Sequence, residues 1–198
     1  ESKIISILQN SNEVDFLKDQ SIEDCIIITE NTCFYGESGG QVGDTGTIKS
    51  KNGEFLVTDT KKTPQGIFIH FGKLISGSIN VGEDVDLSID EERRSLIMKN
   101  HSATHLLHAA LRNTLGNHVA QRGSLVNSEK LRFDFSHNKQ ISYDDINKIQ
   151  DEVNSVIKTS SKSNIEIKSQ EDAIKAGAIA LFGEKYGDEV RVVTLGSK

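Results

Sequence analysis

The sequence predicts an α+β protein, in which a barrel or sandwich of short strands is followed by a region that mixes helices and strands. Three observations support this fold class. Short apolar runs over residues 3–90 are separated by Gly, Asn and Ser, which is typical of many short strands joined by turns. Residues 91–115 carry apolar side chains at helical spacing, and amphipathic helices alternate with strands beyond residue 116.

Composition excludes several classes of protein. Of the 198 residues, 35% are hydrophobic and 26% are charged, which indicates a soluble globular protein rather than a disordered one. No apolar run approaches the ~18 residues of a membrane span and no secretory signal opens the chain, so we expect no membrane partner. Cys25 and Cys33 are the only cysteines, which rules out a disulfide framework and favours a cytoplasmic location.

The first half is expected to form six strands. The Asn52-Gly53 pair is of the kind that closes a hairpin, and residues 73–82 have the Gly, Ser and Asn content of a connection. The predicted strands cover residues 3–8, 25–29, 46–49, 54–59, 66–71 and 84–89.

A long helix over residues 91–115 is predicted to open the second half. Ser88 and Glu91 have the spacing of a capping box, and Gly116 is a typical stop. This places the boundary between two subdomains after residue 92 and gives subdomains of residues 1–92 and 93–198.

Strands and amphipathic helices alternate beyond Gly116. Ser142 is predicted to cap a helix that turns Ile146, Ile149, Val153, Val156 and Ile157 toward a core. The other predicted elements are strands over 123–126, 131–135, 165–168 and 190–195, and a helix from Ser169 through Ala180.

Charge is unevenly distributed along the chain. The net charge is −6, which argues against a general DNA-binding protein and predicts no DNA partner. It consists of −10 over residues 1–92, +6 over residues 93–140 and −2 over residues 141–198. The basic segment could meet nucleic-acid phosphates on one face, and a solvated helix face is the alternative interpretation.

Three histidines fall on one face of the predicted long helix. His101 and His105 are four residues apart, and His108 is close to the same face. Two histidines at this spacing can offer two nitrogens to a zinc ion, although a polar helix face has the same pattern. Ser102 stands where a zinc protease carries its glutamate base, so that class is excluded. No spacing favours a third ligand among Cys25, Cys33, His108, His118 and His137.

Two other segments carry polar groups of interest. Residues 36–46 contain five glycines but match neither a P-loop nor a dinucleotide fingerprint. They form either an irregular hairpin or a loop that closes on a ligand, with Gln41 as its polar tip. Gln121 and Arg122 precede a predicted strand and bring an amide and a guanidinium near the histidines, unless they are ordinary surface residues.

Several blocks of the sequence resemble a known family. Residues 100–112, 115–126 and 131–137 resemble the editing domain of alanyl-tRNA synthetase. The glycine-rich residues 34–46 resemble the barrel segment of the same enzyme, and residues 176–188 match as well. The related families are free-standing alanyl-tRNA editing proteins and, more distantly, the editing domain of threonyl-tRNA synthetase.

This resemblance implies a fold and an activity. The fold would be a small β-barrel followed by an α+β editing domain of the threonyl/alanyl-tRNA synthetase type. The activity would be hydrolysis of the ester of tRNA(Ala) mischarged with serine or glycine. By resemblance, His101 and His105 are Zn²⁺ ligands, and Thr104 and Gln121 are pocket residues that take part in recognition and hydrolysis. His108 is frequent in the family but is not one of its ligands.

One departure from the family pattern changes the expectation. The family completes its zinc site with a Cys-x-x-x-His motif shortly after the segment that matches residues 190–193, and this sequence reaches Lys198 before such a motif. We therefore expect a fragment of a larger synthetase, with weak or absent zinc binding and no ATP site.

The expected partners are the acceptor end of tRNA(Ala) and the rest of the parent synthetase. Gln41, Arg94 and Arg122 are the candidate contacts to tRNA or substrate. Three alternatives stay open: a tRNA-binding fragment without catalysis, a free-standing alanyl-tRNA editing protein, and a structural module whose histidines are surface residues.

Overall fold

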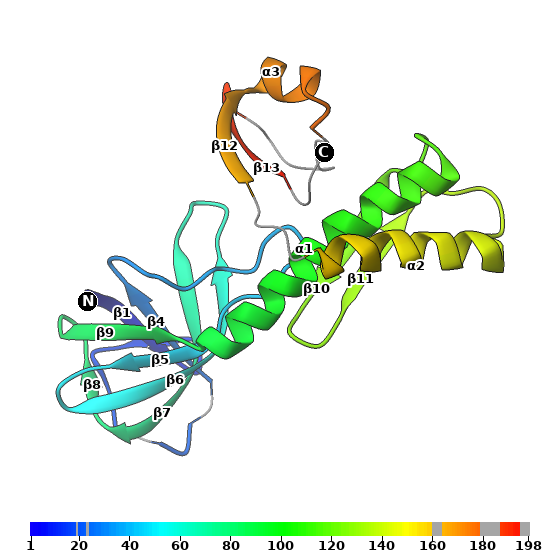
Figure 1. The fold of residues 1–198 in the computed structure, drawn as a ribbon. Helices are drawn as coiled ribbons and strands as arrows, with labels where there is room; N and C mark the ends of the chain where they lie inside the picture. The colour runs from blue at the N-terminus through cyan, green and yellow to red at the C-terminus, as the bar shows by residue number, and fades with distance from the viewer. Residues whose placement is uncertain (19, 23, 160–163, 179–186, 195–198) are drawn as a thin grey trace. The chain divides into compact units, whose positions relative to one another are not determined.

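The computed structural model describes residues 1–18, 20–22, 24–159, 164–178 and 187–194 (Figure 1). The chain divides into two compact units. The first consists of residues 1–98 with 127–129, and the second of residues 99–126 with 130–198. The division falls inside the long helix α1 (Glu91–Leu115) rather than before it, because the first turns of α1 are bonded to the strand-rich unit.

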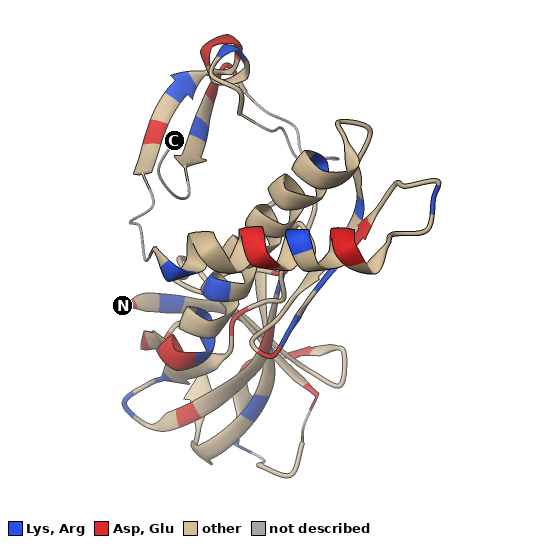
Figure 2. Cartoon of the chain, turned by 45° about the vertical axis from the view of Figure 1, so that its right-hand side comes forward, with Lys and Arg blue, Asp and Glu red and all other residues tan. Residues whose placement is uncertain are grey.

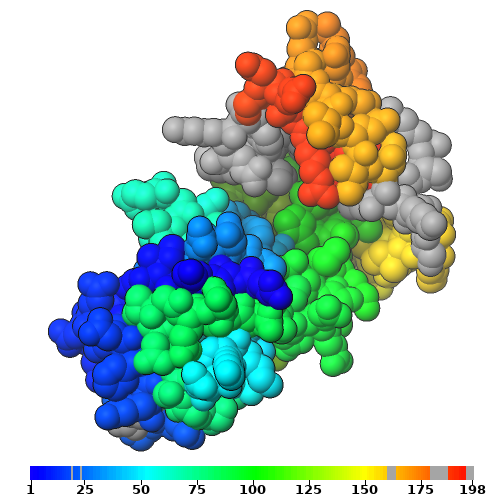
Figure 3. Space-filling model, turned by 90° about the vertical axis from the view of Figure 1, so that its left-hand side faces the viewer, coloured from blue at the N-terminus to red at the C-terminus, as the bar shows by residue number. Residues whose placement is uncertain are grey.

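Six antiparallel strands of the first unit pair in a closed ring. Their order is β1-β4-β7-β6-β5-β9, and β9 pairs again with β1. The space-filling view shows atoms of β1 lying against those of β9 (Figure 3). These six are the six strands that the sequence predicts: β1 (Ser2–Gln9), β4 (Cys25–Thr29), β5 (Gly46–Lys49), β6 (Gly53–Lys62), β7 (Phe68–Gly77) and β9 (Asp84–Ile89).

Some boundaries in this unit differ from the prediction. β7 runs on to Gly77, so residues 73–77 belong to a strand rather than to a connection. The reason is non-local, since β6 provides pairing partners along the whole of β7. Three short strands were also not predicted: β2 (Asn12–Val14), β3 (Phe16–Leu17) and β8 (Ile79–Asn80).

Alternating side chains of the ring fill one core. Ile7, Ile27 and Phe55 are fully buried in this cluster. The alternation of buried and exposed residues along β4 and β6 is the period-two pattern of strands with one face on a core. Apolar burial of this kind is the main stabilising contribution to the unit.

The helix α1 has the predicted bounds but a different cap. Asp90, not Ser88, caps it, because the Asp90 side chain accepts a hydrogen bond from the backbone N–H of Arg93 at 2.9 Å. Ser88 is still part of β9, where it pairs with Thr47. Gly116 follows the last turn with φ +113, and its N–H bonds to the Arg112 carbonyl, as a glycine C-terminal stop does.

The second unit packs the later part of α1 with a hairpin and a second helix. The hairpin pairs β10 (Gln121–Val126) with β11 (Leu131–Phe135), and the helix is α2 (Tyr143–Lys158). Their common core contains Leu111, Val119 and Ile149. Ser142 caps α2 as predicted, accepting from the N–H of Asp145 at 3.1 Å.

The core side of α2 is narrower than predicted. Ile149 is buried and Val153 packs against the core, but Ile146 and Ile157 are exposed. The opposite face alternates acidic and basic side chains, as Figure 2 shows along α2. Such a face is typical of a helix with one side in solvent.

The C-terminal part of the second unit is a hairpin with a short helix. β12 (Asn164–Ser169) pairs with β13 (Glu189–Thr194), and α3 (Gln170–Lys175) follows β12 directly. α3 ends earlier than the predicted Ala180, since Gly177 has φ +83 and its N–H bonds back to Ile174. Ala180 itself, and the predicted strand end at residue 195, lie outside the described residues. In the described part of the chain, no helix has the length and apolar character needed to cross a bilayer.

Candidate functional site

Four polar side chains form a stripe on α1, which we call the polar stripe: His101, Thr104, His105 and His108. At 100° per residue they fall within roughly 100° of one helix face. Thr104 and His108 are buried, and the other two are half-buried. Burial of so many polar groups on one face requires partners or a ligand, which marks this face as the candidate site.

His101 and His105 bring their imidazoles together. Their ring centroids are 5.0 Å apart with an angle of 38° between the planes. Burial, together with the neighbouring His101 and His108, lowers the pKa of His105, so its ring is neutral near pH 7. Neutral imidazoles are the form that binds a transition metal, so this pair is suited to supply two zinc ligands.

The described residues supply no complete metal centre around this pair. Across the part of the chain that the structure describes, no group of three or more His, Cys, Asp and Glu side chains is arranged to hold a metal ion. His118 and His137 bond to each other instead, with Nε2 and Nδ1 2.9 Å apart. Cys25 is buried in the core of the first unit and Cys33 is exposed.

Thr104 has its hydroxyl engaged within the helix. Its Oγ1 donates to the carbonyl of Asn100 at 2.8 Å. This bond uses the hydroxyl proton and leaves the oxygen able to accept. A ligand hydroxyl that donates would therefore find a fixed acceptor at this position.

Gln121 is the first residue of β10, which begins two residues earlier than the predicted strand. It pairs with Phe135, and the register then shifts between Gln121 and Gly123. An irregularity of this kind re-aims the side chains beside it. Gln121 is half-buried, whereas Arg122 is exposed.

The glycine-rich segment of the first unit forms a tight hairpin. Ser38 and Gln41 exchange backbone hydrogen bonds of 3.1 and 2.9 Å, and the two residues between them are Gly39 (φ +59) and Gly40 (φ +84). The positive φ values explain the two glycines. The tip is therefore Gly39-Gly40, and Gln41 is 8% exposed rather than the polar tip that the sequence suggested.

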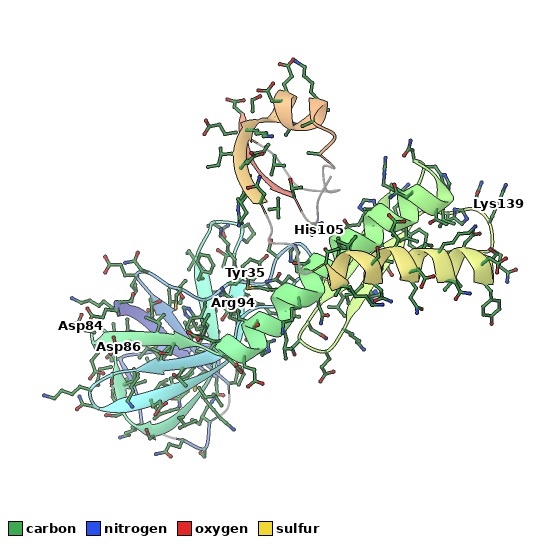
Figure 4. All side chains as sticks on the ribbon, viewed as in Figure 1. Tyr35, Asp84, Asp86, Arg94, His105 and Lys139 are labelled. Atoms are coloured by element: carbon green, nitrogen blue, oxygen red, sulfur yellow. The ribbon has the colours of Figure 1, made fainter. Side chains whose placement is uncertain are left out.

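Arg94 is engaged by a buried carboxylate. The Asp44 side chain accepts from Arg94 Nε at 2.8 Å, forms an ion pair with Nη2, and accepts from the backbone N–H of Tyr35 at 2.7 Å. Figure 4 shows Tyr35 and Arg94 together near the beginning of α1. Asp44 lies within the glycine-rich motif, but its pairing with a residue 50 positions away has no signal in the sequence.

The family comparison and the sequence comparison both find similarity to aminoacyl-tRNA synthetases. Residues 1–93 match the family described as tRNA synthetases class II (A). Over 196 residues, or 99% of the chain, the sequence is 50% identical to alanine–tRNA ligase of Ruegeria sp. (strain TM1040). The chain matches a segment of the alanine–tRNA ligases.

Two other relatives have comparable similarity. Alanine–tRNA ligase of Chelativorans sp. (strain BNC1) is 51% identical over 88% of the chain, and that of Rhodopseudomonas palustris is 48% identical over 99%. The chain spans about a fifth of the length of these ligases, from 20% to 22%. The similarity to alanine–tRNA ligases covers both units, whereas the class II family match covers most of the first unit.

Proposed function

We propose that this chain is the editing part of an alanine–tRNA ligase and hydrolyses the ester of tRNA(Ala) charged with serine or glycine. The observation that carries the proposal is the polar stripe, in which two buried and two half-buried polar side chains share one helix face. It lies in a chain whose whole length is similar to alanine–tRNA ligases. A stripe that served packing alone would be apolar, as the neighbouring core positions of α1 are.

The need for such an activity follows from size and polarity. A pocket built for alanine cannot exclude the smaller glycine, and serine adds only a hydroxyl, so binding alone discriminates poorly. A second site that bonds to the serine hydroxyl rejects alanine, since alanine would leave a buried polar group unpaired. The Thr104 oxygen, with its own proton already donated to Asn100, is the acceptor that we assign to this hydroxyl.

Zinc is the metal that suits the histidine pair. His101 and His105 would hold it through ring nitrogens, with further ligands from outside the described residues. When bound, zinc polarises a carbonyl or lowers the pKa of water. We assign Gln121, at the start of β10, the role of contributing an amide to the proposed site.

The test is deacylation by the full ligase that contains this sequence. Serine-charged tRNA(Ala) should be hydrolysed, and alanine-charged tRNA(Ala) should be largely spared. His101→Ala with His105→Ala should lower zinc content and reduce the rate by at least about 100-fold, since a Lewis acid is worth several kcal/mol. Tyr143→Ala, at the exposed start of α2, is the control and should leave both unchanged.

The same assay tests the specificity residue. Thr104→Val keeps the shape but removes the acceptor, and should reduce the preference for serine over alanine by about 2- to 10-fold, the value of one hydrogen bond. Thr104→Ser keeps the hydroxyl and should retain the preference. An unchanged preference in the valine variant would refute the assignment of Thr104.

A second candidate is a tRNA-binding segment without catalysis. It is favoured by one observation: among the described residues, no group of three or more His, Cys, Asp and Glu side chains is arranged to hold a metal ion. The deacylation assay on the full ligase distinguishes hydrolysis of mischarged tRNA(Ala) from tRNA binding without catalysis. A ligase that binds tRNA(Ala) but releases no serine from it would support this second function.

A further inference from the structure

His108 is the most buried histidine of the polar stripe and the one to which the family resemblance gives no role. It is 5% exposed, and its ring lies 5.0 Å from the ring of Phe133. Its Nε2 is buried and has no hydrogen-bond partner among the described residues. A buried polar atom in this state is rare in native proteins and marks a place where a ligand or water is expected.

The other ring nitrogen fixes the tautomer. The ring lies within reach of the backbone carbonyl of Val119, and since Nε2 has no partner, the nitrogen that faces this carbonyl is Nδ1. Arg112 donates to the same carbonyl at 3.2 Å. With its proton on Nδ1, the neutral ring carries its lone pair on Nε2.

The environment keeps this ring neutral. Burial lowers the pKa of His108, and the neighbouring positive charge of Arg112 acts in the same direction against the opposing Val119 bond. A neutral imidazole held by a backbone carbonyl is oriented to accept at Nε2. The chemistry available to this atom is therefore that of a base.

The position of His108 connects it to the rest of the polar stripe. Thr104 and His105 precede it by four and three residues, which puts all three on neighbouring parts of one helix face. The two rings are close enough that a positive charge on His108 would lower the pKa of His105. His108 thus lies beside the residues to which the proposed function assigns the serine side chain and the metal.

We propose that Nε2 of His108 is the general base of the proposed hydrolysis. It accepts a proton from the attacking water as the water oxygen bonds to the ester carbonyl carbon. The bond between that carbon and the terminal ribose oxygen of the tRNA then breaks, and the proton passes from Nε2 to this ribose oxygen. Water and ester are consumed, and the free amino acid and the tRNA hydroxyl are formed. The inference rests on the proposed function.

A purely structural role would use only the Nδ1 bond to Val119, so the test must separate the two nitrogens. His108→Asn places an amide N–H where Nδ1 stands, so it can keep the Val119 bond, but it has no group at the position of Nε2. His108→Gln does the reverse, since it reaches the position of Nε2 but lacks the donor to Val119. The asparagine variant therefore isolates the chemical role.

We expect the asparagine variant to lose rate in the chemical step alone. In the full ligase, His108→Asn should lower kcat for serine-charged tRNA(Ala) by about 100-fold or more, in the range of general-base catalysis. KM, Tm and zinc content should stay at wild-type values. His108→Gln should lower both kcat and Tm, since it loses the tie to Val119 as well. Activity of His108→Asn within about threefold of wild type would overturn the inference.

Chemical rescue covers the case in which His108→Asn is unstable. His108→Ala leaves space for an imidazole, and added imidazole should restore a large part of the lost rate, with wild type in the same imidazole as control. Absence of rescue would overturn the role of His108. A wild-type ligase that releases no serine would instead overturn the proposed function itself, so the two failures are distinguishable.

Discussion

The tautomer of a buried histidine can be worked out at His70, a residue that no sequence motif singles out. His70 has no exposed surface. Its Nδ1 donates to the carbonyl of Ile27 at 2.9 Å, so its Nε2 must accept from the Thr32 hydroxyl at 2.8 Å. Thr32 Oγ1 in turn accepts the backbone N–H of Phe34 at 3.1 Å. One neutral imidazole therefore fixes the chain that leads into the glycine-rich segment.

This arrangement predicts a loss of stability in acid. Burial lowers the pKa of His70 below 6.5, so the unfolded chain binds its proton at a higher pH than the folded chain does. The His70 contribution to the free energy of unfolding is complete above about pH 6.5 and decreases as pH falls toward the folded pKa, by at most about 1.4 kcal/mol per pH unit.

Urea unfolding of the chain at about pH 7.5 and about pH 5 measures this effect. Between these two values the wild type should lose more stability than His70→Gln. His105 and His108 also have lowered pKa values, but their contributions are common to both proteins and cancel in the comparison. Equal losses in the two proteins would contradict the assignment to His70.

At the scale of elements, the start of α1 and the glycine-rich hairpin act as one piece. Asp44 binds Arg94 on the helix and the backbone N–H of Tyr35, and Thr60 on β6 donates to the Asp44 carbonyl at 2.9 Å. Arg93 adds a bond to the Gly43 carbonyl at 2.9 Å. Gly43 packs so closely on the Thr60 carbonyl that an added Cβ would lie 2.0 Å from it. The hairpin is therefore held at its base while its tip is a two-glycine turn.

Removing Arg94 should destabilise the chain. The Asp44 side chain is 3% exposed, so Arg94→Met would leave a buried carboxylate without its cation. We expect the free energy of unfolding to fall by about 2–3 kcal/mol. This is less than the roughly 3–5 kcal/mol lost when one partner of a fully buried ion pair is removed, because Arg94 is itself 28% exposed. Urea unfolding measures it, with Lys148→Met on the exposed face of α2 as a control within about 0.5 kcal/mol of wild type.

A wild-type stability for Arg94→Met would mean that the ion pair contributes nothing to holding the hairpin. The same contacts also affect the prediction that Arg94 binds tRNA. Its guanidinium already bonds to Asp44 and to the Cys33 carbonyl, so a loss of tRNA binding on its substitution would mix folding with recognition. Arg122 is exposed and gives a cleaner test.

At the scale of the whole molecule, charge is the feature most relevant to a nucleic-acid partner. Residues 93–140 carry a net charge of +6 in a chain whose total is −6. Within the second unit, the exposed basic residues Arg122, Lys130, Arg132 and Lys139 belong to the β10–β11 hairpin and the connection after it. An anionic partner would therefore be attracted to this part of the chain and repelled by the acidic first unit.

Arg122→Gln should weaken tRNA binding by the full ligase. It should also reduce the slope of log affinity against log salt by about one, the contribution of one phosphate contact. Affinity measured over a salt series tests this, with Lys148→Gln as the matched loss of one positive charge on α2. If the slope of log affinity against log salt is the same in Arg122→Gln as in the wild type, Arg122 does not contact a tRNA phosphate.

Local patterns allowed much of this molecule to be predicted from the sequence. The six ring strands, the bounds of α1, and the caps of α2 and α3 all depend on signals within a few residues, either period-two alternation, helical spacing or a capping side chain. The placement of three histidines on one helix face follows from the same helical repeat. Two errors arise from distant partners: β7 is extended by its pairing with β6, and Ser88 is held in β9 by its pairing with Thr47, which leaves Asp90 to cap α1.

The sequence alone therefore determined which residues share an element and a face, because the spacing of apolar and polar residues can be seen within a short stretch of sequence. Only the tertiary structure decided which groups are desolvated and what they bond to. Closure of the ring by β1 and β9, capture of Arg94 by Asp44, and orientation of His108 by the Val119 carbonyl all join residues separated along the chain. Hydrogen bonding and burial depend on distance in space, and that is fixed only when the chain has folded.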